Sequence, residues 1–226
     1  MTELKFNEKE HKYTYGDTEL TSVTTWLSQF SKPFDMKEAT KNYAGYLKRN
    51  GYVHVDNKKI TPSVIKKHWD FIRDEGTRVH RQIEGLVNRE KIFPKPNKKA
   101  RDAYEYVEGE LRKLNKPRAI PEQKIYNLDY GLAGMMDFPV YHTTDEGELV
   151  MTLYDWKIVD NMTPDKLKKY TLQLSTYALM SESLNPDWKI QELKLIQVTD
   201  EGVKVHNIEY KKEEVIQKLK ESGRWQ

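Results

Sequence analysis

The chain has 226 residues, about one and a half times a typical domain of roughly 150, and its 38 Lys and Arg against 35 Asp and Glu leave a net charge of +3. Cysteine is absent, which excludes a disulfide scaffold, a thiolate nucleophile, a cysteine zinc site and an iron–sulfur cluster. The 14 Tyr, 6 Phe and 5 Trp supply rings for a core, so intrinsic disorder is not expected. Because the net charge is small, a nucleic-acid partner has to be inferred from local sites.

The N-terminal half has the patterns of short strands followed by helices. Ring residues before a Gly16-Asp17 turn favour two short strands, and Ser22 has the position of a helix N-cap. Apolar residues at helical spacing predict helices over 23–30, 36–48, 62–87 and 98–114. Between them, residues 49–57 predict a loop or a short hairpin.

From residue 120 the periodicity changes to that of strands. Three are expected in succession, over 120–126, 133–141 and 148–158, and then a helix over 165–183. Strands over 190–199 and 203–210 and a helix over 212–222 complete the chain. This order predicts an α/β protein with a central mixed β-sheet flanked by helices.

One domain is expected, because the chain contains no repeat, low-complexity tract or long linker. We divide it into a helical N-terminal elaboration over 1–67, a core over 68–200 and a C-terminal strand and helix over 201–226. No stretch approaches the roughly 18 apolar residues of a membrane span, and the N-terminus is too polar for a signal peptide. An intracellular protein without a membrane partner is therefore expected.

The expected strand 148–158 carries charge where apolar residues are expected. Side chains alternate between the two faces of a strand, so Asp155 and Lys157 share a face with Leu149, Met151 and Leu153. Both faces are largely apolar, which predicts a central strand whose far end opens into a site. Burying these charges costs free energy unless a partner compensates. The common interpretation is an ion pair at a strand end; the alternative is a metal-binding carboxylate beside a lysine that positions a hydrolytic water.

A second carboxylate, Asp137, ends the sequence Gly134-Met135-Met136-Asp137 on the preceding strand. An antiparallel pairing of the two strands brings Asp137 near Asp155. Two ionised carboxylates repel each other unless a cation lies between them, and an oxygen-rich site of this kind suits Mg²⁺ or Mn²⁺. The bland alternatives are turn or bulge chemistry for the glycine and a solvent contact for Asp137.

Two helices carry further polar pairs at i and i+4. His80 and Glu84 share one face of the expected helix 62–87, where His80 borders an apolar stripe. By itself such a histidine is more often structural, but an imidazole beside two carboxylates favours Mn²⁺. Gln173 and Tyr177 share a face of the helix 165–183, where they either fill the core or support the lysine.

The order of these weak signals resembles the RecB-like branch of the PD-(D/E)xK nuclease superfamily, and most of all the single-stranded-DNA exonucleases related to the mitochondrial genome-maintenance exonuclease and their phage counterparts. The resemblance covers roughly residues 5–198. Its motifs are Ser22-Val23-Thr24, Gly76-Thr77-Arg78-Val79-His80, Glu122 before a strand, Gly134-Met135-Met136-Asp137, Asp155-Trp156-Lys157 and Gln173-Leu174-Ser175-Thr176-Tyr177.

The resemblance implies a restriction-endonuclease-like core and a metal-dependent exonuclease acting on DNA, single-stranded or from free ends, in a cellular or phage-infected cytoplasm. The implied ligands of Mg²⁺ or Mn²⁺ are His80, Asp137, Asp155 and the backbone carbonyl of Trp156. Lys157 is implied to orient the attacking water, so Asp137, Asp155 and Lys157 form the catalytic set. The residues implied to lie around this set or to contact substrate are Gln173, Tyr177, Ser22, Thr24 and, as second-metal or structural carboxylates, Glu84 and Glu122.

Two rival functions remain open at this point. One is a structure- or site-specific endonuclease of the same fold, and the other is a non-catalytic nucleic-acid-binding module. Aromatic and basic residues of the N-terminal helices either form a stacking and phosphate-binding arch or are ordinary core and surface residues. They are Tyr43, Tyr46, Lys48, Arg49, Trp69 and Arg73.

Overall fold

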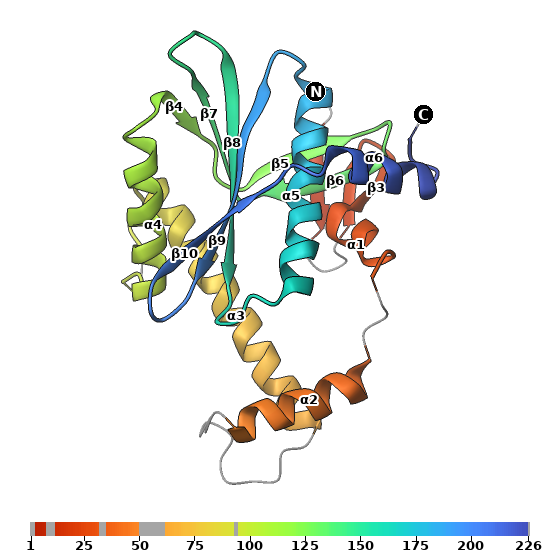
Figure 1. The fold of residues 1–226 in the computed structure, drawn as a ribbon, viewed down its shortest axis with the longest axis vertical. Helices are drawn as coiled ribbons and strands as arrows, with labels where there is room; N and C mark the ends of the chain where they lie inside the picture. The colour runs from red at the N-terminus through yellow and green to blue at the C-terminus, as the bar shows by residue number, and fades with distance from the viewer. Residues whose placement is uncertain (1–2, 8–11, 32–34, 50–61, 93–94, 226) are drawn as a thin grey trace.

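The computed structural model describes residues 3–7, 12–31, 35–49, 62–92 and 95–225 (Figure 1). Its elements in chain order are β1 (Leu4–Asn7), β2 (Lys12–Tyr15), β3 (Thr18–Ser22), α1 (Val23–Ser28), α2 (Met36–Arg49), α3 (Pro62–Val87), α4 (Lys98–Leu111), β4 (Asn115–Ala119), β5 (Gln123–Asn127), β6 (Leu132–Met136), β7 (Phe138–Thr143), β8 (Leu149–Ile158), α5 (Pro164–Leu184), β9 (Lys189–Val198), β10 (Val203–Ile208) and α6 (Lys212–Glu221). The predicted α/β class is confirmed.

The described strands form two mixed sheets, so the prediction of a single central sheet is wrong. Sheet one has the order β1-β2-β3-β6-β5, with a parallel pair between β3 and β6. Sheet two has the order β10-β9-β8-β7-β4, with a parallel pair between β8 and β9. The predicted strand 133–141 is in fact two strands, because the chain leaves sheet one after Met136 and enters sheet two at Phe138.

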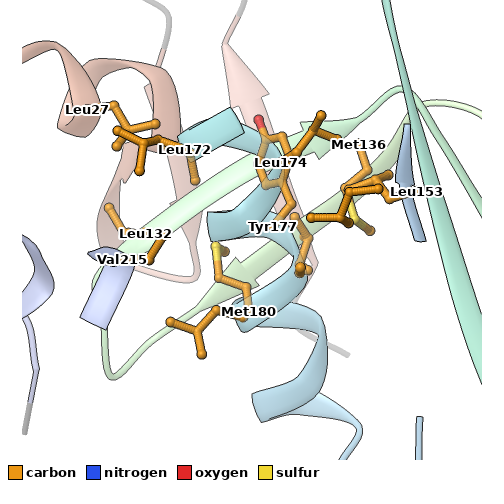
Figure 2. Packing of buried hydrophobic residues seen from close by; sticks show 14 of the residues in the cluster. Leu27, Leu132, Met136, Leu153, Leu172, Leu174, Tyr177, Met180 and Val215 are labelled. Atoms are coloured by element: carbon orange, nitrogen blue, oxygen red, sulfur yellow. The ribbon is translucent and has the colours of Figure 1, made fainter. Parts of the chain in front are cut away.

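Helix α5 packs against both sheets and joins them through one apolar cluster. Figure 2 shows this cluster around α5, with Leu174, Tyr177 and Met180 of the helix facing Leu132 and Met136 of β6. Ten consecutive residues of α5, Leu172–Ser181, are buried. A helix buried on every side belongs to the interior rather than the surface of a fold.

The other face of sheet two is covered by α3 and α4. Val79 and Ile83 of α3 and Val107 of α4 pack there against rings of β7 and β8. Helices cover both faces of β8, and all its residues from Val150 to Trp156 are buried. The prediction of a central strand over 148–158 is therefore confirmed.

Several boundaries depart from the sequence analysis. Three strands, β1 to β3, precede α1, so the N-terminal elaboration is not only helical, and α3 runs through the predicted division at residue 67. Strand β4 was not predicted, because its sequence Asn-Lys-Pro-Arg-Ala is polar and contains proline, features of an edge strand. Helix α4 ends at Leu111 rather than at 114.

Most of the predicted loop over 49–57 lies outside the described residues. No helix within the described ranges combines the length and the apolar character that crossing a membrane requires.

Candidate metal centre

Asp137 is the single residue between β6 and β7, at the point where the chain passes from sheet one to sheet two. Its Oδ2 accepts a hydrogen bond of 3.0 Å from the backbone N–H of Trp156, which fixes the carboxylate against β8. Its carbonyl oxygen accepts a 3.0 Å bond from the backbone N–H of Glu122. The register Phe138–Tyr154 places Asp137 across from Asp155 at the ends of the antiparallel pair, as the sequence analysis expected.

Two further groups complete a compact donor set around Asp137. Nδ1 of His80, from α3, lies 3.6 Å from Oδ2 of Asp137. One side-chain ligand atom each from His80, Glu122 and Asp137 lies within 4.8 Å of the others, a grouping that fits a metal ion. The sequence analysis placed Glu122 at the margin of the site, whereas the structure places it in this group.

Glu122 stands in the turn between β4 and β5 with φ at 51°, in the left-handed region that side chains other than glycine seldom adopt. Backbone strain of this kind tends to collect at functional sites. Burial, followed by the charges of Asp137, Glu84 and Asp155, raises the pKa of Glu122 to about 8. Several carboxylates thus lie near one another, with Lys157 as the cation that opposes their effect on Glu122.

Asp155 and Lys157 form a buried ion pair, with 2.5 Å between Oδ2 and Nζ. Asp155 is only 2% exposed, and burial raises its pKa, an effect that the Asp137 charge adds to and the Lys157 charge opposes. For Lys157, burial alone lowers the pKa, but the carboxylates of Asp155 and Asp137 outweigh it and the net pKa is raised. The ammonium form of Lys157 is therefore retained within the site.

The lowered pKa of His80 favours its neutral imidazole form. Burial lowers its pKa and the Lys157 charge acts in the same direction, while Asp137 and a hydrogen bond with the backbone of Trp156 oppose the shift. A neutral ring nitrogen is the form that binds a divalent ion. Thus His80, Asp137 and the backbone of Trp156 are in mutual contact, with Asp137 accepting from the Trp156 N–H.

Gln173 and Tyr177 support the site from the interior side. A Cβ on Gly134 would lie 2.6 Å from Cε1 and 2.8 Å from the hydroxyl of Tyr177, so the tyrosine occupies the space that the glycine leaves open. Burial raises the pKa of the Tyr177 phenol, to which Gln173 is hydrogen-bonded. The Gly134 motif and the Gln173–Tyr177 pair, which the sequence analysis treated as separate signals, are therefore two sides of one contact.

Tyr170 is a neighbour of the lysine that the sequence analysis missed. Its ring centroid lies 4.8 Å from Nζ of Lys157, within cation–π range. Tyr170, Gln173 and Tyr177 are spaced at i, i+3 and i+7 on α5, and this spacing is the signal that points to one shared face.

The remaining predicted residues are placed further from the cluster. Glu84 lies one turn after His80 on α3, and its charge acts on Glu122. Ser22 is the N-cap of α1, where its hydroxyl accepts from the backbone N–H of Thr25 and lies 3.2 Å from Oγ1 of Thr24. A structural role accounts for the contacts of Ser22, and Thr24 is exposed.

The chemistry of the donor set fits a hard or borderline divalent cation. Carboxylate oxygens suit Mg²⁺ or Mn²⁺, and the imidazole of His80 shifts the preference toward Mn²⁺. A cation there would neutralise the charges that now raise the pKa of Glu122. The residues in position to hold it are His80, Glu122 and Asp137. The predicted ligand Asp155 is not part of this group, and its Oδ2 pairs with Lys157 instead.

A groove of about 910 Å³ is lined by Ile158 to Asn161, the residues that follow Lys157 in the chain. Tyr43 of α2 and Trp69 and Phe71 of α3 also line it, whereas Lys157 and the residues of the metal centre do not. Figure 1 shows α2 and the first half of α3 extending away from the sheets at this place. Lys67, Lys99 and Lys166 also line the groove, together with Glu75, Asp160 and Asp200.

Comparisons with known proteins add little to this picture. No family model matches the chain, and no curated protein matches it. Among solved structures, the crystal structure of SSO0001 is similar at 11% identity and a TM-score of 0.35, over 87% of this chain and 80% of that one.

Proposed function

We propose that the chain is a metal-dependent nuclease that hydrolyses phosphodiester bonds of DNA. The observation that carries this proposal is the meeting of His80, Glu122 and Asp137 within 4.8 Å of one another, beside a buried Asp155–Lys157 pair. A surplus of carboxylates next to a retained ammonium suits a reaction in which negative charge gathers on a phosphate.

The residues of the chain divide the chemistry between them. His80, Glu122 and Asp137 would hold the divalent cation, which when bound supplies a Lewis acid and a water of lowered pKa. Lys157, kept protonated by Asp155 and steadied by Tyr170, provides fixed positive charge for the phosphate and a donor that orients the attacking water. Tyr177 and Gln173 hold β6 and α5 at the spacing that this arrangement needs.

Membership of the RecB-like PD-(D/E)xK branch is part of the proposal. It is supported by the order in which the chain supplies its site: a histidine from a helix, an aspartate where β7 begins, a D-x-K from β8 and a Q-x-x-x-Y from α5. The strand pair β7–β8 and the helix α5 that follows it supply a core compatible with a restriction-endonuclease-like fold.

Single-stranded DNA, entered from a free end, is the proposed substrate. The support is the groove lined by Ile158 to Asn161, the residues after Lys157, whose aromatic side chains suit stacking with unpaired bases and whose lysines suit phosphates. Of the predicted arch, Tyr43 and Trp69 line this groove. Arg73 instead pairs with Asp70 and Asp74 on its own helix, and the side chains of Tyr46, Lys48 and Arg49 lie outside the described residues.

The test is digestion of end-labelled single- and double-stranded DNA and RNA with Mg²⁺, Mn²⁺ or a chelator, with Asp155→Asn as the matched variant. We expect cleavage of linear single-stranded DNA with metal, and none with the chelator or in Asp155→Asn. Cleavage that persists with the chelator or in the variant would contradict the proposal, and so would an inactive wild-type protein.

A circular single-stranded DNA separates exonuclease from endonuclease. An enzyme that needs a free end leaves the circle intact while it degrades the same sequence after linearisation. Cutting of the circle would assign the same metal centre to an endonuclease. DNA binding without cleavage of either form would identify a non-catalytic binding module.

A further inference from the structure

A second pocket, of about 340 Å³, lies at the edge of sheet two between β4, β7 and the segment that follows α5. This volume is at the lower end of the range for small-molecule sites. Its polar and aromatic lining includes Lys116, Arg118, Gln123, Tyr141, Asn185 and Trp188, besides His142 and Thr143.

The pocket is positively charged. Lys116 and Arg118 supply two cations, and among the described residues that line it none is acidic. The groove at Ile158 to Asn161, in contrast, is lined by cations and carboxylates together. Arg118 pairs in register with Tyr141, and its charge acts on the pKa of the Tyr141 phenol, against the larger raising effect of burial. The pocket therefore favours an anionic ligand.

The backbone beneath these cations is irregular. Lys116 has φ at 49°, and the register between β4 and β7 shifts between Asn115 and Arg118. Bulges of this kind on edge strands re-aim side chains and are frequent beside binding sites. In a regular strand, the alternation of side chains would determine the face on which Lys116 and Arg118 lie. The register shift removes this constraint for the two cations.

The other feature of the pocket is a pair of rings. The Tyr141 and Trp188 rings are in edge-to-face contact, with centroids 5.0 Å apart. The Tyr141 hydroxyl donates a 2.9 Å hydrogen bond to Oε1 of Gln123, which fixes that ring. Fixed aromatic side chains beside cations are the combination that binds a nucleotide, with the base against the rings and the phosphate at the cations.

The pocket is connected to the metal centre by the turn between β4 and β5. Glu122 belongs to the metal cluster, and the next residue, Gln123, lines the pocket. Strand β7 likewise begins directly after Asp137 and carries Tyr141 to the pocket. The pocket and the metal centre are therefore connected by the β4–β5 turn and by β7, along which Tyr141 lies four residues from Asp137.

We propose that this pocket binds one nucleotide, with its phosphate at Lys116 and Arg118 and its base against Trp188 and Tyr141. The choice of a nucleotide rests on the proposed nuclease function. Two sources share this chemistry: a nucleotide of a DNA strand that extends past the metal centre, and a free nucleoside monophosphate released by hydrolysis.

Binding is measured in chelator with the full chain, so that neither metal nor cleavage contributes. The probes are thymidine monophosphate, followed by NMR titration, and a fluorescent ten-residue oligothymidylate, followed by anisotropy. The test variants are Lys116→Ser/Arg118→Ser and Trp188→Leu, with Trp188→Phe as the ring-retaining variant. The matched charge control is Lys5→Ser/Lys220→Ser, which removes two exposed cations on β1 and α6.

We expect the pocket variants to bind at least one probe at least tenfold more weakly, Trp188→Phe to retain most of the affinity, and the charge control to change it by less than threefold. Loss of thymidine monophosphate binding assigns the pocket to a free nucleotide, and loss for the oligonucleotide alone assigns it to a strand. Equal affinities of the pocket variants and the control for both probes would overturn the proposal, even if metal-dependent cleavage is found. Conversely, an inactive protein whose pocket variants lose binding would reject only the nuclease.

Discussion

Two largely buried lysines on neighbouring strands differ in the charges around them, and this difference distinguishes a structural ion pair from a candidate reactive site. Lys157 of β8 and Lys194 of β9 each lie against carboxylates and over a tyrosine ring. Around Lys194, 3.1 Å from Glu110 and 2.9 Å from Glu192, a second lysine, Lys113, also pairs with Glu110, so the charges balance. Lys157, in contrast, faces the carboxylates of both Asp155 and Asp137, with Glu122 and Glu84 beyond them.

The difference has a measurable consequence in the carboxylates. Hydrogen bonding by Lys113 lowers the pKa of Glu110, whereas burial and neighbouring carboxylates raise that of Glu122 to about 8. A cluster in which lysines and carboxylates are equal in number is already neutral, whereas a cluster with surplus buried negative charge is stabilised by an added cation. The Lys194 cluster is therefore a structural tie between α4 and sheet two, and the Lys157 cluster is a candidate site.

The largest expected effect is on cleavage. Lys157→Ala removes the fixed positive charge from the phosphate site and should lower the rate of metal-dependent DNA cleavage by about 10³-fold, the scale for loss of one electrostatic contributor. Lys194→Ala should leave the rate within about threefold of wild type. Single-turnover cleavage of end-labelled single-stranded DNA measures both, and equal losses in the two variants would erase the distinction between the clusters.

The same two variants should differ in how metal affects their stability. Lys157→Ala leaves the buried Asp155 unpaired, which should lower the free energy of unfolding in chelator by about 3–5 kcal/mol. Mn²⁺ should restore much of this loss, because it can replace the missing positive charge. Lys194→Ala should also be destabilised, but Mn²⁺ should stabilise it no more than it does the wild-type protein. Urea unfolding with and without Mn²⁺ provides the comparison, and an absence of selective rescue would contradict it.

A smaller difference between the two clusters is expected for the tyrosine rings that contact the two lysines. Tyr170→Leu removes the ring that steadies Lys157 and should lower kcat about tenfold with little change in KM, since a cation–π contact contributes roughly 0.5–2 kcal/mol. Tyr170→Phe keeps the ring and should restore most of the rate. Tyr154→Leu, beneath Lys194, should affect stability rather than kcat. A kcat for Tyr170→Phe as low as that of Tyr170→Leu would show that the ring is not what matters.

The smallest expected effects are opposite slopes of stability with pH. Glu122 keeps its proton in the folded state up to about pH 8, while the unfolded chain releases it near pH 4.5, so its contribution falls as pH rises through this range. Glu110 has a lowered pKa, so its contribution is present above its unfolded pKa and is lost on acidification.

In chelator, Glu122→Gln should therefore be more stable than wild type at pH 8, because glutamine has no charge for burial and the carboxylates of Asp137, Glu84 and Asp155 to oppose. At pH 4.5 the two proteins should be similarly stable, because Glu122 is then protonated in the folded wild-type protein. Glu110→Gln should show its deficit at neutral pH and lose it on acidification. Melting temperatures across this range measure both slopes. A Glu122→Gln profile parallel to that of wild type would contradict the assigned pKa.

Local pattern was sufficient to predict much of the molecule. Helical spacing placed α3 over residues 62–87, and alternation along 148–158 predicted both the central position of β8 and the shared face of Asp155 and Lys157. These features depend on periodicity within one element, which a sequence displays directly.

Features that depend on distant parts of the chain were not predicted. Whether β6 and β7 belong to one sheet or two is decided by their pairing partners, β3 and β5 for β6 and β4 and β8 for β7, which periodicity within one strand does not show, so the crossing at Asp137 was missed. The meeting of Glu122 with His80 and Asp137 and the placement of the Tyr170 ring over Lys157 are tertiary features. Lys194 lies in a strand whose local pattern resembles no motif, and only its partners reveal its role as a structural tie.

The most direct test of the surplus-charge account is calorimetric titration of the metal-free protein with Mn²⁺, beside Asp137→Asn and the control Glu110→Gln. The account predicts saturable binding in the wild-type protein and in Glu110→Gln, and at least a tenfold weaker affinity in Asp137→Asn. Equal binding by all three proteins, or no binding by the wild type, would contradict it.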